Sequence, residues 1–268
     1  MSTWLPVAPC TPRDCVRGTT DRAGAMRAVL RLAAVLTLVA AGAALLPFGR
    51  RVPAAAVRRW CRWVVRAAGV RVRIAGRAAP SGGLLLVAPH VSWLDVPLLA
   101  AVRPARMVAK AEIRRWPVAG PLAARGGVLF LDRDRLRALP GTVDRIAGVL
   151  RAGGAVAAFP EGSTWCGRER GPFRRAVFQA ALDARVPVQP VRIRYLGPRE
   201  SPTTAAAFVG DDTLLRCVWR VVSARGLIAE VETCAPLPSG PHTDRRDLAY
   251  AARRAVGGPV AVVSTAGN

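Results

Sequence analysis

The stretch Leu84-Leu85-Leu86-Val87-Ala88-Pro89-His90-Val91-Ser92-Trp93-Leu94-Asp95 reads as a strand, a turn and the start of a helix. Its continuous apolar run follows Ser81-Gly82-Gly83 and is typical of a strand that is buried on both faces of a sheet. Pro89 keeps the residue before it extended, so we expect the strand to end there. His90 then follows the carboxyl end of a strand, where open α/β sheets bind their ligands.

His90 and Asp95 are candidates for a catalytic pair. In an unbroken helix they would lie about 140° apart around the axis, so they meet only if the chain turns between them. An Asp95 carboxylate bonded to one ring nitrogen would make the other nitrogen a better general base for a hydroxyl. A structural alternative stays open, because Ser92-Trp93-Leu94-Asp95 is also typical of a capping box at a helix start.

The composition is strongly basic. The 268 residues include 40 basic and 17 acidic side chains, a net charge of +23, and every basic residue except Lys110 is an arginine. This charge predicts an anionic partner, such as membrane lipid, a phosphorylated substrate or nucleic acid. The six cysteines lack a metal-like pair spacing and the chain has only two histidines, so we expect reduced thiols and no metal site.

The N-terminal part predicts a membrane-associated segment over residues 26–68, after a disordered tail at 1–25. Residues 32–48 carry no charge. The length of this uncharged stretch is at the lower limit for a membrane span, which takes roughly 17–25 residues. A re-entrant helix and a cleaved signal peptide are alternatives. Residues 53–68 form a basic amphipathic pattern with two tryptophans. This helix would lie on an anionic bilayer or pack on the domain, and the two segments together would make a helical hairpin.

From residue 69 to 257, strand and helix patterns alternate. This alternation predicts an α/β domain with a mixed, largely parallel sheet flanked by helices, followed by a tail at 258–268. Strands are expected at 70–74, 84–88, 106–110, 128–131, 155–159 and 227–233, and helices at 92–101, from 110 to Pro117, and at 135–152, 173–184 and 243–256.

Two further strand ends carry polar residues. Asp132-Arg133 follows the strand at 128–131, and Pro160-Glu161-Gly162-Ser163 follows the strand at 155–159. If both ends lie beside His90, one pocket would hold a base, a guanidinium, a carboxylate and a glycine turn. Such a guanidinium can bind a phosphate with two hydrogen bonds, and a glycine allows close approach of backbone N–H groups to an anion.

These residues resemble the motifs of the 1-acyl-sn-glycerol-3-phosphate acyltransferase family of membrane glycerolipid acyltransferases. His90-Val-Ser-Trp-Leu-Asp95 is similar to its His-x4-Asp motif, and Gly127-Val-Leu-Phe-Leu-Asp-Arg133 to its second motif. Phe159-Pro-Glu-Gly162 is similar to the third and Val186-Pro-Val-Gln-Pro190 to the fourth. All four occur in the family's order, and the resemblance covers roughly residues 80–235.

The resemblance implies a glycerol-3-phosphate acyltransferase-like fold at the cytoplasmic face of the cell membrane. It implies transfer of a fatty acyl group from acyl-CoA or acyl carrier protein to the hydroxyl of a lysophospholipid. Lysophosphatidic acid, which gives phosphatidic acid, is the acceptor expected first. The hydroxyl attacks the thioester directly, in agreement with the lack of a G-x-S-x-G elbow, and no metal or redox cofactor is required.

The same resemblance assigns roles to single residues. His90 is the general base and Asp95 orients it. The acceptor-binding residues are Arg133, Glu161, Gly162, Ser163 and Lys110.

The third motif departs from the family in one respect. The family commonly has Thr-Arg after the glycine, whereas Ser163-Thr164-Trp165 stands here. A basic contact to phosphate would have to come from elsewhere, for example from Arg168, Arg170 or Arg174. Another lysolipid, such as lyso-ornithine lipid, is therefore the alternative acceptor.

A basic nucleic-acid- or membrane-binding protein without enzymatic activity is the alternative from another class. The arginines are spread along the whole chain, and no aromatic–basic platform or recognition helix is visible. We therefore expect membrane lipids as partners and no nucleic acid.

Overall fold

A seven-stranded sheet forms the centre of the protein, with the strand order β1-β7-β6-β2-β5-β3-β4. The computed structural model describes residues 8–18, 22–48, 52–116, 119–132, 135–240 and 244–257. All neighbouring strands pair in parallel except β6 and β7, which are antiparallel. The predicted mixed, largely parallel sheet is confirmed. The strands are β1 (Arg71–Ala75), β2 (Leu84–Val87), β3 (Arg106–Lys110), β4 (Leu129–Leu131), β5 (Ala155–Ala158), β6 (Val188–Leu196) and β7 (Ile228–Thr233).

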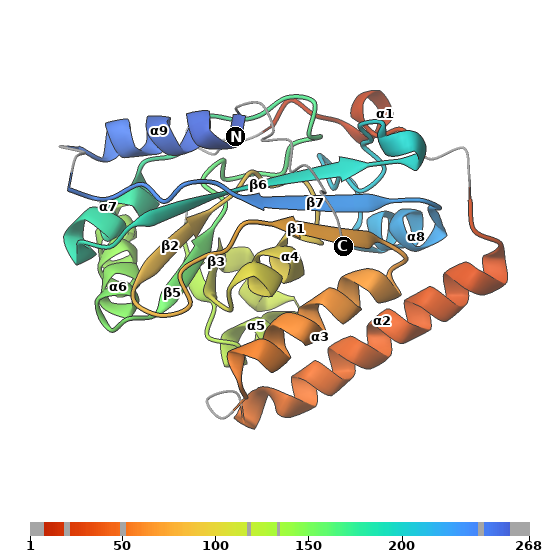
Figure 1. The fold of residues 1–268 in the computed structure, drawn as a ribbon, viewed down its shortest axis with the longest axis horizontal. Helices are drawn as coiled ribbons and strands as arrows, with labels where there is room; N and C mark the ends of the chain where they lie inside the picture. Colours follow the sequence, from red (N-terminus) through yellow and green to blue (C-terminus); the bar gives the residue numbers. More distant parts are fainter. Residues whose placement is uncertain are drawn as a thin grey trace, which may run out of the picture.

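Helices cover both faces of this sheet (Figure 1). Residues of α2, α3, α4 and α8 pack in one hydrophobic cluster, and residues of α6, α7 and α9 pack in another on the opposite face. The helices are α1 (Pro12–Cys15), α2 (Ala25–Leu45), α3 (Ala54–Ala67), α4 (Asp95–Val102), α5 (Ala119–Arg125), α6 (Leu139–Arg151), α7 (Ala176–Ala184), α8 (Leu214–Ser223) and α9 (Arg245–Gly257). Short 3-10 turns lie at Leu46–Phe48, Ala111–Arg115, Leu136–Ala138 and Pro198–Glu200.

Strand β2 is the most central element of the sheet. Leu84 and Leu86 belong to the cluster under α4, whereas Leu85 and Val87 belong to the cluster under α6 and α7. None of the four side chains is more than 1% exposed. The continuous apolar run therefore has a physical cause, because both faces of this strand are covered.

Helix α2 begins earlier than the predicted segment at 32–48 and includes two arginines, Arg27 and Arg31, in its first half. The Arg31 guanidinium donates to the carbonyls of Val222 and Ala224 at the end of α8, over 2.9 and 2.7 Å. Within the apolar region from Ala25 to Phe48, an 18-residue window has a mean hydropathy of 2.3, and only 6% of that window is buried. By length and composition, it is a helix that can cross a membrane.

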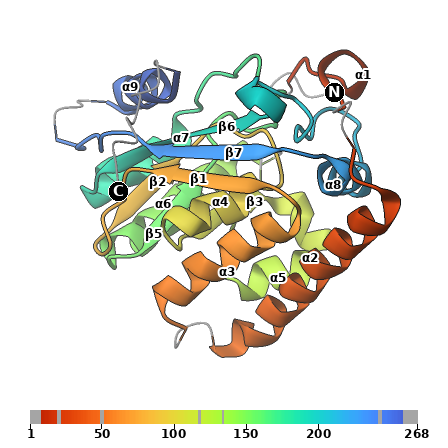
Figure 2. The same cartoon turned by 45° about the vertical axis from the view of Figure 1, so that its right-hand side comes forward.

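Helices α2 and α3 form the predicted hairpin, and lie side by side in both views (Figures 1 and 2). The Trp60 indole N–H donates to the carbonyl of Leu38 over 3.0 Å. Gly42 lies against the same ring, since a Cβ there would come within 2.3 Å of it. On its other side α3 buries Val65 against the domain, while Trp63 remains 49% exposed.

The described part of residues 1–25 packs on the domain, in contrast to the predicted disordered tail. Cys10 is buried, and the Arg17 N–H donates to the hydroxyl of Thr204 over 2.9 Å. The Ala23 N–H donates to the carbonyl of Ser223 over 2.7 Å. The segment is ordered because its backbone groups find partners on distant parts of the chain. The predicted tail at 258–268 lies outside the described residues.

Candidate active site

The turn between β2 and α4 is organised around the buried carboxylate of Asp95. Its Oδ2 accepts hydrogen bonds from the N–H groups of Val91 and Ser92, over 2.7 and 2.8 Å. The same oxygen lies 2.9 Å from Nδ1 of His90. Helix α4 begins at Asp95 and not at the predicted Ser92, because these bonds hold the preceding residues in a turn. The Asp95 carboxylate therefore does both things that the sequence allowed: it pairs with His90, and it caps the backbone N–H groups before α4.

Tyr195 completes the bonding of that carboxylate. Val87 at the end of β2 pairs with Pro190, so β6 continues beyond β2 and carries Tyr195 over the turn. The Tyr195 hydroxyl donates to Oδ1 of Asp95 over 2.6 Å. Burial, and next the Asp95 charge, raise the pKa of Tyr195 well above its usual value, so the phenol remains a donor. The sequence analysis missed Tyr195; the signal was a tyrosine next to Leu196 and two positions after Ile193, which needs a polar partner when buried.

The His90 ring is held in one orientation. It stacks on Phe159, with 4.0 Å between ring centroids and an interplanar angle of 10°. Its side chain is 24% exposed, whereas Asp95 is fully buried. The contact of Nδ1 with the Asp95 carboxylate favours a proton on Nδ1. Nε2, on the opposite side of the ring, is then the free proton acceptor.

Glu161 fixes the backbone of the same histidine. Its Oε2 accepts from the His90 N–H over 2.8 Å, and its Oε1 accepts from the Gly171 N–H over 3.0 Å. The Trp165 N–H donates to the His90 carbonyl over 2.8 Å. Burial raises the pKa of Glu161 to about 7, although the two N–H donors and the charge of Arg170 act in the opposite direction. The loop after β5 thus holds His90 at both its N–H and its carbonyl.

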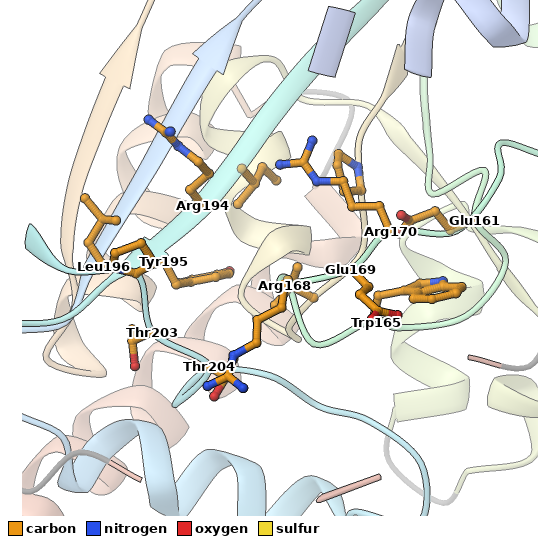
Figure 3. A pocket seen from close by; sticks show the side chains of 15 residues that line it. Glu161, Trp165, Arg168, Glu169, Arg170, Arg194, Tyr195, Leu196, Thr203 and Thr204 are labelled. Carbon is orange, nitrogen blue, oxygen red and sulfur yellow. The ribbon is translucent and has the colours of Figure 1, made fainter. Parts of the chain in front are cut away.

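A cavity of about 160 Å³ opens beside the turn that carries His90 and Asp95 (Figure 3). Pro89 and Val91, the neighbours of His90, line it together with Glu161 and Tyr195. Besides Glu161, its ionisable lining residues are Arg168, Glu169, Arg170 and Arg194. Two of the three arginines that the sequence offered as substitute phosphate contacts therefore reach the cavity. The third, Arg174, is exposed outside it and donates its N–H to the Pro160 carbonyl.

Gly162 and Ser163 form the turn after β5. Gly162 has a φ of +80°, a left-handed conformation that glycine adopts without strain. Its N–H donates to the Phe159 carbonyl over 3.1 Å. The Ser163 hydroxyl oxygen is buried and has no hydrogen-bond partner among the residues that the structure describes.

The residues predicted at the ends of β3 and β4 lie at the same edge of the sheet as His90, but farther from β2 in the strand order. Lys110 is the exposed last residue of β3, which is separated from β2 by β5. Asp132 follows β4, and its 40% exposed carboxylate lies 3.7 Å from Arg135. Neither residue lines the cavity in the described part of the chain. Arg133 lies outside the described residues.

Comparisons with known proteins agree with this geometry. Residues 69–194 match the family model described as Acyltransferase. The lyso-ornithine lipid O-acyltransferase of Pseudomonas aeruginosa is 38% identical, over 86% of this chain and 92% of that protein. The chain belongs to the acyltransferase family. Its predicted identification as an acyltransferase is thus confirmed.

Other acyltransferases complete the comparison. The 1-acyl-sn-glycerol-3-phosphate acyltransferase of Neisseria gonorrhoeae is 35% identical, over 65% of this chain and 68% of that protein. The crystal structure of the 1-acyl-sn-glycerophosphate acyltransferase PlsC from Thermotoga maritima superposes with a TM-score of 0.62 at 15% identity, over 87% of this chain and 95% of that one. The latter match confirms the predicted acyltransferase fold. These lipid-acylating relatives and the apolar helix α2 indicate membrane association.

Proposed function

We propose that this acyltransferase transfers a fatty acyl group from a thioester to the free hydroxyl of a lysolipid. The contact between His90 and Asp95 carries the proposal, because it leaves Nε2 of His90 as a general base. Nε2 takes the hydroxyl proton while the oxygen attacks the thioester carbonyl. The tetrahedral intermediate then expels the thiolate, which receives the proton from the imidazolium.

The carboxylate of Asp95 supports the charged state of this cycle. When Nε2 is protonated, the positive imidazolium lies beside a buried negative charge, which favours it. The bonds from Val91, Ser92 and Tyr195 fix the position of the carboxylate beside the ring. Asp95 therefore orients His90 and balances its charge.

The acceptor candidates are lysophosphatidic acid and lyso-ornithine lipid. The extent of the match to the lyso-ornithine lipid O-acyltransferase favours the second, since that match covers 92% of the relative. The cavity lining supports it too. Arg168 and Arg170 suit either a phosphate or a carboxylate, whereas Glu169 would attract an ornithine ammonium and repel a phosphate. A lipid headgroup with both charges therefore fits this lining best.

The donor is acyl-CoA or acyl carrier protein, and the domain faces the cytoplasm, where both thioesters occur. Helix α2 embeds in the membrane through exposed side chains, namely Met26, Val29, Leu30, Leu36, Val39 and Leu45. Protease treatment of sealed vesicles tests the orientation. Inside-out vesicles should lose the domain, while right-side-out vesicles should protect it.

The activity test is a thiol-release assay with acyl-CoA and each lysolipid separately, using wild type and His90→Ala side by side. Release that requires lyso-ornithine lipid and disappears in the variant supports both the mechanism and the acceptor. Release with lysophosphatidic acid alone would assign the other acceptor. If neither lysolipid gives release, acyl carrier protein replaces CoA as the donor. Failure of that donor with both acceptors would refute the proposed function.

A further inference from the structure

Three cysteines converge at one point outside the catalytic pair. Cys10 and Cys15 come from the N-terminal segment, and Cys166 comes from the loop after β5. Their sulfur atoms all lie within 4.8 Å of one another. Cys10 and Cys166 are buried and Cys15 is partly exposed, so the group is closed on one side and open on the other.

The N-terminal half of the cluster is shaped by a single helical turn. The Thr11 hydroxyl accepts the Asp14 N–H at the start of α1, and the Cys15 N–H donates to the Thr11 carbonyl. One turn of helix therefore brings Cys15 back towards Cys10. Gly210 lets this turn pack closely on the domain, because a Cβ at this position would approach the Cys10 carbonyl oxygen to 2.9 Å.

The other half of the cluster is the turn that follows Cys166. Gly167, with a φ of +88°, turns the chain directly after Cys166. The side chain of Cys166 is buried, and its sulfur lies among those of Cys10 and Cys15.

We propose that Cys10, Cys15 and Cys166 form a structural site for one thiolate-binding metal ion, Zn²⁺ or Cu(I). Thiolate ligands suit both ions, and Zn²⁺ needs a fourth ligand besides the three sulfurs. A tetrahedral Zn²⁺ with Zn–S bonds of about 2.3 Å separates its sulfurs by roughly 3.8 Å, so the cluster needs only a small contraction. Water at the open side beside Cys15 would supply the fourth ligand of Zn²⁺.

The convergence of three sulfurs favours a metal over a disulfide. A disulfide joins two cysteines and would leave the third thiol without a role in a largely buried position. A metal ion uses all three. The sequence alone did not indicate this site, because Cys166 is distant from the other two cysteines in the chain.

The site would fasten the N-terminal segment to the loop that holds the catalytic histidine. Trp165, the residue before Cys166, donates its N–H to the His90 carbonyl, and Gly171 in the same loop donates to Glu161. Arg168, also in this loop, lines the cavity. Metal removal should therefore lower the melting temperature and raise the acceptor KM more than it lowers kcat.

The test is metal binding by the full-length protein, purified in detergent and kept reduced. Zn²⁺ and Cu(I) are added in separate titrations against a chelator, and bound metal is counted by elemental analysis. We expect one ion per chain. Cys10→Ser, Cys15→Ser and Cys166→Ser should each weaken binding by at least about 10- to 100-fold, the loss typical of removing even an outer-shell partner. Cys234→Ser, outside the cluster, should bind as wild type does.

Cobalt(II) provides a readout that does not depend on the folding of variants. Wild-type protein with bound Co²⁺ should show the intense thiolate-to-cobalt charge-transfer absorption of a tetrahedral site, and Zn²⁺ should displace it. The proposal is refuted if reduced wild type binds neither Zn²⁺ nor Cu(I), or if the three variants bind as wild type does. A Cys10–Cys166 disulfide in protein that binds no metal after reduction would also refute it.

Discussion

Two ends of the same sheet edge differ sharply in how their polar residues are held. At the ends of β2, β5 and β6, Asp95 and Glu161 are at most 2% exposed, and all four of their carboxylate oxygens accept hydrogen bonds. At the ends of β3 and β4, Lys110 is exposed and Asp132 has a side chain that is 40% exposed. The buried end suits the proposed proton transfer, whereas a contribution of Arg133 and Lys110 at the open end to acceptor binding stays a prediction.

The largest expected effect is at the buried end. His90→Ala removes the proton acceptor and should lower kcat by about 10²- to 10⁴-fold, with little change in the acceptor KM. Initial rates of thiol release at saturating acceptor measure this effect. The melting temperature should stay close to that of wild type, because the ring is partly exposed. A loss of less than about tenfold in a folded variant would contradict the assignment of His90.

Glu161→Gln tests the burial of the carboxylate that holds His90. The pKa of Glu161 is raised from 4.5 to about 7, so the folded state binds this proton more tightly than the unfolded state does. Its contribution to stability is complete below about pH 4.5 and is lost as the pH rises through about 7. The expected difference is about 3 kcal/mol in the free energy of unfolding, since one pKa unit corresponds to about 1.4 kcal/mol.

Melting temperatures of wild type and Glu161→Gln between pH 4.5 and 7.5 measure this difference. The glutamine does not titrate, so the variant should gain stability relative to wild type as the pH rises. The exposed Glu112→Gln is the control and should follow wild type. A constant difference between wild type and Glu161→Gln across this range would show that the carboxyl does not titrate there.

Arg133→Ala tests the open end. If Arg133 binds the acceptor as the resemblance implies, its loss should raise the acceptor KM by roughly 10- to 100-fold and leave the donor KM nearly unchanged. Lys110→Ala should act in the same direction but more weakly. Arg137→Ala, which removes an exposed arginine nearby, is the matched control. Equal increases in both KM values would remove Arg133 from the acceptor site.

Tyr195→Phe has the smallest expected effect and separates orientation from simple packing. It removes one donor from Asp95 and should lower kcat by roughly 2- to 10-fold. The acceptor KM should stay within about twofold of wild type, because the hydroxyl contacts Asp95 and not the acceptor. Tyr250→Phe changes the other tyrosine of the chain, which is 62% exposed, and should leave kcat and KM unchanged. A kcat of Tyr195→Phe equal to that of wild type would contradict a role of this hydroxyl in positioning Asp95.

Local patterns predicted much of this structure. The strand at 84–88 was visible because its apolar run is buried on both faces, and the meeting of His90 with Asp95 followed from a turn that the sequence permits. The partner of Tyr195 was not predictable, because its contact with Asp95 depends on how far β6 extends beyond β2. Helix α8 was also missed. Its exposed face carries Leu214, Leu215 and Trp219, which blurs the polar–apolar periodicity of the segment.

Long-range packing accounts for what the sequence analysis did not reveal. The described part of the N-terminal tail is ordered by partners such as Thr204 and Ser223, which lie far away in the chain. The sequence offered Arg168, Arg170 and Arg174 as replacements for the missing basic contact to phosphate. Of these, Arg168 and Arg170 line the cavity and Arg174 does not. Sequence spacing offers no way to choose among arginines on one loop, because the direction of each side chain is set by the fold.

The bond between Trp60 and Leu38 has a consequence for the depth of the protein in the bilayer. It holds α3 against the middle of α2, and with it the arginines Arg58, Arg59, Arg62 and Arg66. If α2 stood upright across the bilayer, these guanidiniums would enter the hydrocarbon at about 2.5–3.5 kcal/mol each. The hairpin therefore favours a shallow position within one leaflet, with the arginines at the phosphate level. A lysolipid could then reach the enzyme by lateral diffusion, without leaving its monolayer.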